Sequence, residues 1–343
     1  MCKRIMAAQT NTENGVPFYK IGTIGGKADA YISKELFDEY KTKYSFPRKG
    51  EVMITCAGTV GKCIIYNGED SYYQDSNIVW IDNPNEILSN DFLYHLLCKV
   101  NWSHLNSTTI VRIYNDDLRN LKLYYPRHNE QKKITHFLQL INERIATQNK
   151  IIEDLKKLRS AISLNVLHSS TWKQFKIKDI AQIGRGRVIS FIEISQQKNP
   201  TYPVYSSQTS NDGIMGYLDD YMFEGEYISW TTDGANAGTV FYRDGKFNCT
   251  NVCGLLKLRN GFDTHFVSLI LAEATKKYVS INLANPKLMN NTMGNIQICL
   301  PEFEEQKRIS IVFKKLQELL DVQKILLNQY SKQKQCLLRQ MFI

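Results

Sequence analysis

Several short motifs of this sequence resemble catalytic or phosphate-binding signatures, but each is incomplete. The Gly-Lys pairs of IGGKAD and GTVGKC lack the earlier glycine and the following Ser or Thr that a phosphate-binding loop requires. The stretch Asn199–Tyr202 lacks the second proline of the Asn-Pro-Pro-aromatic tetrapeptide of amino-methyltransferases. Glu130 and Glu305 each begin a nuclease-like Glu-x-Lys, without a metal-binding Asp at a suitable distance upstream. We therefore expect no catalytic residue, metal site or cofactor in this chain.

Other residues have the chemistry to bind nucleic acid. The net charge of +9 favours a polyanionic partner, because Lys and Arg pair with phosphates while amide and hydroxyl side chains bond to base edges. In the first half the candidates are Lys3, Arg4, Lys20, Lys27, Tyr73, Gln74, Ser76, Asn77, Thr109 and Arg112. In the second half they are Arg185, Arg187, Ser207, Gln208, Thr209, Asn211, Thr232, Asp233, Asn236, Asn248, Thr250, Asn251, Asn285 and Lys287. Any of these could instead stabilise a turn or a strand end, and the similar places of Asn77 and Asn251 favour such a role for those two.

Length and composition bear on the number of domains, the state of the cysteines and the cellular compartment. The chain has 343 residues, a length that favours about two domains. Among the eight cysteines, Cys249 and Cys253 are the closest pair and have no histidine at ligand spacing, so we expect reduced thiols and not a zinc site. No apolar run approaches the roughly 18 residues of a membrane span, and MCKRIMAAQT lacks the apolar core of a signal peptide. These features predict a soluble, cytoplasmic protein without a membrane partner.

The sequence contains an internal duplication. The motif PRHNEQKKI begins at Pro126 and PEFEEQKRI begins at Pro301, an offset of 301 − 126 = 175 residues. GEVMITCAGTVGKCIIYNG predicts a strand, a glycine-rich turn and a strand, and GEYISWTTDGANAGTVFYRDG predicts the same 175 residues later. Arg112 and Lys287 keep that offset. Each half is therefore predicted to be a mixed α and β domain of roughly 125 residues followed by a helix of about 40.

Both predicted helices carry apolar residues at a 3.5-residue period. The first seam is Ile134, Leu138, Ile141, Ile145, Gln148, Ile152, Leu155, Arg159, Ile162 and Val166. The second is Ile309, Phe313, Leu316, Leu320, Gln323, Leu327, Tyr330, Lys334, Leu337 and Met341. A polar residue at the same seam place, Gln148 or Gln323, fixes the alignment of a coiled coil. We expect an antiparallel coiled coil with internal pseudo-twofold symmetry; the alternative is two amphipathic helices, each packed on its own domain.

The helix starts repeat the pair Glu-Gln, at Glu130 and Gln131 and again at Glu305 and Gln306. Acidic residues suit the positive end of the helix dipole. Capping does not explain why a glutamine and two basic residues follow each time. A contact with a partner protein is the alternative that we keep for this motif.

The duplicated order of a glycine-turn strand pair, an Asn-bearing strand and P-x-x-x-E-Q-K-[KR]-I resembles the specificity (S) subunit of type I restriction-modification systems, the HsdS family. The resemblance implies two target recognition domains, each reading half of a split sequence in double-stranded DNA. It implies that the helices form a spacer and dock two methyltransferase (M) subunits, with restriction (R) subunits joining the complex of the S subunit and its two M subunits. S-adenosylmethionine, ATP and Mg²⁺ would then bind the partner subunits.

The predicted fold class is α+β, with two tandem target recognition domains and two long helices. The domains are 1–127 and 169–301, and the helices 128–168 and 302–343. If the Lys3 segment corresponds to the Arg187 segment, then Thr171 to Gly184 have no counterpart in the first copy. We therefore expect a strand of the first domain to be missing, and Met1 to be an internal methionine or a late start.

Two other functions fit part of this pattern. The main alternative is a coiled-coil scaffold with two protein-interaction domains, which would show no salt-dependent binding to DNA. A nuclease or methyltransferase is a third, and the incomplete motifs argue against it.

Overall fold

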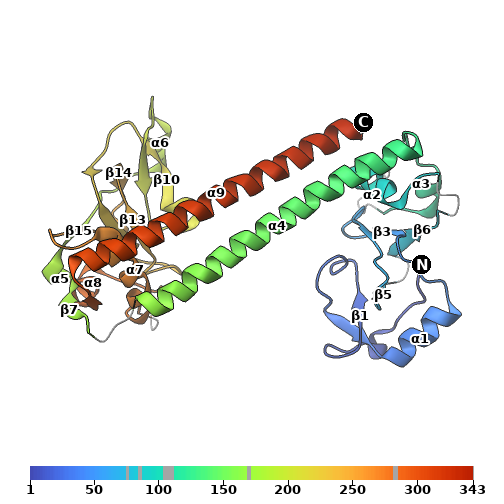
Figure 1. Cartoon of the computed structure of the whole chain (residues 1–343), viewed down its shortest axis with the longest axis horizontal. Coiled ribbons are helices and arrows are strands. Elements are labelled where there is room, and N and C mark those ends of the chain that lie inside the picture. Colours follow the sequence, from blue (N-terminus) through green and yellow to red (C-terminus); the bar gives the residue numbers. More distant parts are fainter. Residues whose placement is uncertain (75–76, 84–86, 103–111, 168–170, 281–284, 343) are drawn as a thin grey trace. The chain divides into compact units, whose positions relative to one another are not determined.

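The computed structural model describes residues 1–74, 77–83, 87–102, 112–167, 171–280 and 285–342. The chain forms two compact units, one of Met1–Asn149 with Leu326–Ile343 and the other of Lys150–Ile325. We call them unit 1 and unit 2. Each contains one copy of the duplicated domain and one end of each long helix (Figure 1). The predicted α+β fold with two domains and two long helices is confirmed.

Unit 1 holds the first copy. Its elements are η1 (Ala7–Gln9), β1 (Val16–Tyr19), β2 (Ala30–Ile32), α1 (Lys34–Lys43), β3 (Val52–Thr55), β4 (Cys63–Ile65), β5 (Tyr72–Tyr73), β6 (Ile78–Ile81), α2 (Asn90–Lys99) and α3 (Asn115–Arg119). The strands form two sheets, of order β2-β1-β5 and β4-β3-β6. An aromatic core that contains Phe18, Phe37 and Tyr72 packs against the sheet β2-β1-β5. Helix α2 packs against the sheet β4-β3-β6 through Leu93 and Leu97.

Unit 2 holds the second copy. Its elements are β7 (Lys173–Lys176), α5 (Ile177–Ile180), β8 (Ala181–Arg185), α6 (Phe191–Ser195), β9 (Tyr202–Tyr205), η3 (Ser210–Gly213), β10 (Ile214–Leu218), β11 (Phe223–Glu224), β12 (Tyr227–Thr231), β13 (Val240–Arg243), β14 (Lys246–Cys249), β15 (Cys253–Leu258), α7 (Thr264–Ala274), η4 (Thr275–Lys277), α8 (Asn290–Asn295) and β16 (Gln297–Leu300). Its sheets have the orders β13-β12-β15-β8, β10-β9-β14-β11 and β16-β7. Trp230 and Phe266 lie at the centre of the main core.

The two copies match down to single hydrogen bonds in their glycine turns. In unit 1 the Thr55 hydroxyl accepts from the Lys62 amide at 3.0 Å, and in unit 2 the Thr231 hydroxyl accepts from the Thr239 amide at 3.0 Å. Each turn also needs a glycine at positive φ. A Cβ on Gly61 would meet Trp102 at 2.1 Å, so this position requires glycine for space as well as for backbone conformation.

Two strands and one helical turn of the second copy, β7, β8 and α5, have no counterpart among the described residues of the first. In unit 2, β8 pairs with β15 and β7 pairs with β16. Among the described residues of unit 1, β6 pairs only with β3, and residues 122–125 belong to no strand. The expectation that the first domain lacks a strand is confirmed for these residues, and the difference extends to the equivalents of β7, α5 and β8.

The long helices are α4 (His128–Val166) and α9 (Phe303–Met341). Every predicted seam position is buried or partly buried. In unit 1 the Arg144 guanidinium lies 5.3 Å from the centre of the Tyr330 ring, and Leu138 shares an apolar cluster with Phe342. Moving toward the N-terminus of α4, from Arg144 to Leu138, the contacts move toward the C-terminus of α9, from Tyr330 to Phe342. The two helices are therefore antiparallel.

Unit 2 contains the other ends of the same two helices. There Arg159 donates to Gln317 at 2.8 Å, and Ile162 packs in one cluster with Phe313. The residue numbers again fall along α9 as they rise along α4. Each helix therefore packs on the other as well as on a domain, and the alternative of two separately packed helices is wrong. In the part of the chain that the structure describes, none of the helices combines the length and apolar character needed to cross a membrane.

Candidate nucleic-acid interface

In unit 2, three polar loops meet beside the ends of β12 and β15. The Asn236 amide donates to the Thr209 hydroxyl at 3.1 Å, and the Ser207 hydroxyl lies 3.4 Å from the Asp233 carboxylate. A backbone bridge joins Asp233 to Lys287. The tertiary structure therefore brings together predicted residues from three separate stretches of sequence.

Arg185 connects this group to a fourth segment. Its Nε donates to Asn290 Oδ1 at 2.9 Å and its guanidinium also donates to the Asn251 carbonyl at 3.3 Å. Arg187 is different, because its Nη1 donates to Glu193 at 2.9 Å. This ion pair raises the pKa of Arg187 and lowers the pKa of Glu193. Arg187 therefore forms an ion pair within the protein.

Lys287 is an exposed cation of this surface. Its side chain makes no ion pair with another described residue, while its backbone is fixed by hydrogen bonds to Ser280 at 3.2 and 3.3 Å. The next residue, Leu288, donates from its amide to the Thr232 carbonyl at 2.8 Å. An exposed ammonium group on a fixed backbone segment suits a phosphate contact, because the charge is accessible and its point of attachment is defined.

The first copy places Arg112 in the same way. Ile113 donates from its amide to the Cys56 carbonyl at 2.9 Å, as Leu288 does to Thr232. Burial raises the pKa of the Cys56 thiol to about 11, and the Arg112 charge acts in the opposite direction. Arg112 and Lys287 therefore precede matched backbone contacts in the two copies.

The other candidates of the first copy form a second group. The Ile21 amide donates to Gln74 at 3.3 Å, which joins the Lys20 loop to the end of β5. The Lys20 ammonium group is paired with the Asp29 carboxylate at 3.2 Å. The Asn77 carbonyl accepts from the Cys56 amide at 2.7 Å, so Asn77 lies beside the Arg112 segment.

The predicted residues differ in exposure. Those exposed are Lys3, Arg4, Lys27, Arg187, Asn211, Asn236, Asn251, Asn285 and Lys287. Those partly buried are Lys20, Gln74, Asn77, Arg112, Arg185, Ser207, Gln208, Thr209 and Asp233. Ser76 and Thr109 lie outside the described residues.

Four predicted contacts are corrected by burial: Tyr73, Thr232, Asn248 and Thr250. Asn248 is fully buried and donates to the Asp220 carbonyl at 2.7 Å. The Tyr73 hydroxyl bonds to Ser71 at 2.8 Å inside the first domain. These four side chains lie inside the domains and are not accessible to DNA in this structure.

The repeated glutamines have a structural role that the sequence did not reveal. Gln131 is fully buried; its side-chain carbonyl accepts from the Ser89 amide at 2.8 Å and its side-chain amide donates to the Pro126 carbonyl at 2.9 Å. Gln306 does the same with Asp263 at 3.0 Å and Pro301 at 2.8 Å. Ser89 and Asp263 are the N-caps of α2 and α7.

Each glutamine therefore ties the start of a long helix to its own domain. The prediction of a partner contact is wrong for Gln131 and Gln306, because neither side chain is accessible. Glu130 and Glu305 are exposed, and for them a partner contact stays a prediction.

Arg243 is a further residue that the sequence analysis missed. Its side chain is 2% exposed, donates to Asp212 at 3.0 Å and to Ser229 at 3.0 Å, and stacks 3.6 Å from the centre of the Tyr205 ring. Asp212 is in the left-handed backbone conformation, with φ of 54°. Arg243 thus fixes the loop that carries Ser207 to Asn211. The one signal for this loop in the sequence was an Asn-Asp-Gly turn, which says nothing of the arginine.

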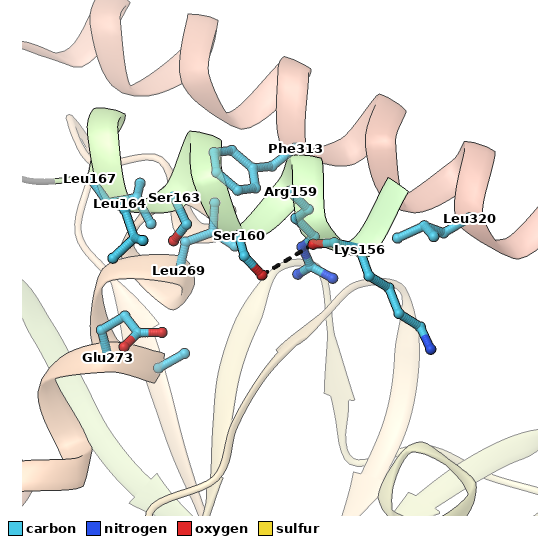
Figure 2. Close-up of a pocket in the computed structure, with 11 residues that line it drawn as sticks. Lys156, Arg159, Ser160, Ser163, Leu164, Leu167, Leu269, Glu273, Phe313 and Leu320 are labelled. Carbon is cyan, nitrogen blue, oxygen red and sulfur yellow. Dashed lines mark hydrogen bonds between the residues drawn. The ribbon is translucent and has the colours of Figure 1, made fainter. Parts of the chain in front are cut away.

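A pocket of about 440 Å³ lies between α4, α7 and α9 in unit 2 (Figure 2). Leu164 faces it from α4, Leu167 from just beyond the end of α4, Leu269 from α7 and Phe313 from α9. Leu164 is 73% exposed. Polar and charged side chains, among them Lys156, Arg159 and Glu273, line the rest of the hollow. An open hollow of mixed lining beside an exposed leucine has the character of a protein-binding surface.

The described part of the chain holds no group of three or more His, Cys, Asp or Glu side chains that could bind a metal ion. None of the eight cysteines forms a disulfide in this structure, and Cys249 and Cys253 are buried.

Comparisons with known proteins agree with this architecture. The family model for the type I restriction modification DNA specificity domain matches residues 1–157 and 169–329. A protein of Haemophilus influenzae named as a type I restriction enzyme specificity subunit is 51% identical over 138 residues, which are 40% of this chain and 36% of that protein. The match therefore spans little more than a third of that relative.

A longer match and a solved structure extend the comparison. A protein of Mycoplasma pneumoniae named as a type I specificity subunit is 34% identical over 220 residues, 60% of this chain and 80% of that protein. The crystal structure of a type I restriction-modification system S subunit from M. genitalium covers 100% of this chain and 92% of its own, with a TM-score of 0.69 and 18% identity. At that identity the likeness concerns the fold.

Proposed function

The chain belongs to the family of type I restriction-modification DNA specificity subunits, and we propose that each of its two domains reads one part of a bipartite target in double-stranded DNA. The observation that carries this proposal is the match between Arg112 and Lys287. Each precedes a residue whose amide bonds to the strand-end carbonyl of Cys56 or Thr232. Two equivalent cations on two equivalent domains suit two half-sites.

Base selection in the second domain is assigned to the loops around Lys287. Asn236 and Arg185 offer amide and guanidinium groups, which form the usual contacts to adenine and guanine edges. Arg112 and Lys287 supply the phosphate contacts that set the register. Because the polar loops of the two domains differ in sequence, the two half-sites should differ.

The helices are assigned two tasks. Helices of 39 residues are each about 60 Å long, which suits a spacer that sets the number of base pairs between half-sites. Their outer surface, including the pocket beside Leu164, would dock two M subunits, and R subunits would join through that complex. We assign no catalytic group to this chain; S-adenosylmethionine, ATP and Mg²⁺ would be bound by the partner subunits.

Co-expression with the methyltransferase partner and mapping of methylated sites across the genome tests this function. We expect a split target, and an exchange of Trp172 to Leu300 with a relative should change only one half of it. A change in both halves would contradict the modular assignment. An insertion of four residues after Gln148 should lengthen the spacer and leave both half-sites intact, since it adds about 6 Å to one helix.

The alternative, a scaffold that does not bind DNA, is separated by binding assays at several salt concentrations. DNA binding through phosphates must weaken as salt rises. Binding that is absent at low salt would favour the scaffold.

A further inference from the structure

Two thiols of unit 1 lie in contact between a strand and the helix that packs on it. Cys63 lies on β4 and is 7% exposed, in the core cluster that also contains Leu93 and Leu97 of α2. Cys98, the residue after Leu97, is hydrogen-bonded through its thiol to the thiol of Cys63. The Cys63 sulfur also lies 3.5 Å from the Gly61 carbonyl oxygen. The packing of α2 on β4 therefore joins two cysteines that are 98 − 63 = 35 positions apart.

The two thiols differ in their access to solvent. The Cys98 side chain is exposed, whereas Cys63 is buried. Unit 2 also holds two cysteines in contact, Cys249 and Cys253, but both of these are buried. A small oxidant dissolved in water can therefore reach the outer sulfur of the first pair, while the protein encloses both sulfurs of the second.

Cys98 is also the member of its pair that ionises first. The hydrogen bond from Cys63, with a second one from Tyr94 and the positive charge of Lys334, lowers the pKa of Cys98 to about 7, although partial burial acts in the opposite direction. The contact with Cys98 raises the pKa of Cys63, so the proton stays on the buried sulfur. Close to neutral pH about half of Cys98 is then thiolate, the form that attacks an oxidant.

We propose that Cys98 and Cys63 form a redox site, in which a peroxide oxidises the exposed Cys98 and the buried Cys63 then closes a reversible disulfide with it. The proposal rests on the arrangement of the two thiols in unit 1 and not on the proposed function. Sulfurs that are already in contact need little backbone movement to form the bond. An accessible thiolate beside a second thiol is the arrangement found in cysteines that oxidise reversibly.

Hydrogen peroxide is the oxidant of this reaction. The Cys98 thiolate attacks one peroxide oxygen; an S–O bond forms, the O–O bond breaks, and the departing hydroxide takes up a proton and becomes water. This step leaves a sulfenic acid at Cys98. The Cys63 sulfur then attacks the Cys98 sulfur; an S–S bond forms, the S–O bond breaks, and hydroxide leaves as water with the Cys63 proton. The two sulfurs lose two electrons in all, and the peroxide is reduced to two molecules of water.

The test treats the full chain with a small excess of hydrogen peroxide, blocks the remaining thiols with iodoacetamide and identifies linked peptides by mass spectrometry. We expect one linked pair of peptides, joining Cys63 to Cys98, and recovery of both thiols after addition of dithiothreitol. Cys98→Ser should abolish the link. Cys299 is the internal control for exposure, because its side chain is also exposed, and it should be oxidised more slowly than Cys98.

A second measurement separates the roles of the two sulfurs. In Cys63→Ser the sulfenic acid at Cys98 has lost its resolving thiol, so dimedone should trap roughly tenfold more of it than in the unchanged chain. Oxidation of Cys98 without a link to Cys63, or a link between Cys63 and Cys56 instead, would overturn the pairing. Oxidation of Cys98 no faster than that of Cys299 would overturn the redox site itself.

Discussion

Replacement of Gln306 by alanine should destabilise unit 2 far more than its place on a charged helix start suggests. The side chain is 2% exposed and makes two hydrogen bonds, from the Asp263 amide at 3.0 Å and to the Pro301 carbonyl at 2.8 Å. Its removal leaves a buried donor and a buried acceptor without partners. Each such group costs about 1–3 kcal/mol, so we expect a loss of roughly 2–6 kcal/mol in the free energy of unfolding.

The loss is measured by urea unfolding of the full chain, followed by tryptophan fluorescence and by exchange of unit 2 amides. Trp230 is fully buried in unit 2 and reports on that core. Glu305→Ala is the matched control: it removes an exposed neighbour and should change the free energy of unfolding by about 0.5 kcal/mol or less. If Gln306→Ala were as stable as this control, the structural role of the glutamine would be refuted.

Gln306→Glu sharpens the test by keeping the shape of the side chain. The ionised carboxylate can still accept from the Asp263 amide but cannot donate to the Pro301 carbonyl. When protonated it can do both, while the burial of this site disfavours the charged form. The variant should therefore approach the wild-type stability as the pH falls. A stability difference that does not change with pH would contradict this hydrogen-bond assignment.

Further predictions concern DNA contacts, pH and loop anchoring. Arg112→Ala and Lys287→Ala should each flatten the salt dependence of DNA affinity by about one unit, measured by fluorescence anisotropy; an unchanged slope would exclude a phosphate contact. Burial lowers the pKa of His265 to about 4, below the value of roughly 6.5 for an unfolded histidine. As the pH falls, the imidazole is therefore protonated in the unfolded chain at a higher pH than in the folded chain. The stability that neutral His265 contributes should be present above about pH 6.5 and be lost as the pH falls toward 4, and urea midpoints of His265→Gln should show less of this decline. Asp212→Ala should cost about 1–3 kcal/mol of the free energy of unfolding, because it removes the charged hydrogen bond from the buried Arg243 guanidinium to a carboxylate that solvent partly screens. Asp212→Asn should lie between Asp212→Ala and the wild type in the same urea assay.

The sequence alone determined the architecture that is periodic or repeated along the chain. The seam of α4 and α9 was predictable because a 3.5-residue apolar period puts one stripe on one side of a helix, and that stripe must be buried whatever covers it. The duplication was visible because equivalent turns keep equivalent glycines. The shortened first copy followed from the same alignment, before any strand order was known.

Only the tertiary structure decided which polar residues are accessible to a partner. Gln131 looked like a surface residue, yet its hydrogen-bond partner Ser89 lies 42 positions away along the chain. Asn248 has the type and loop context of a base-reading residue but is enclosed by its domain. Arg243 and Asp212, 31 positions apart, meet because the sheet brings β13 beside the loop. The exposure of a side chain depends on contacts with residues far away in the sequence, and a local pattern of residue types does not predict those contacts.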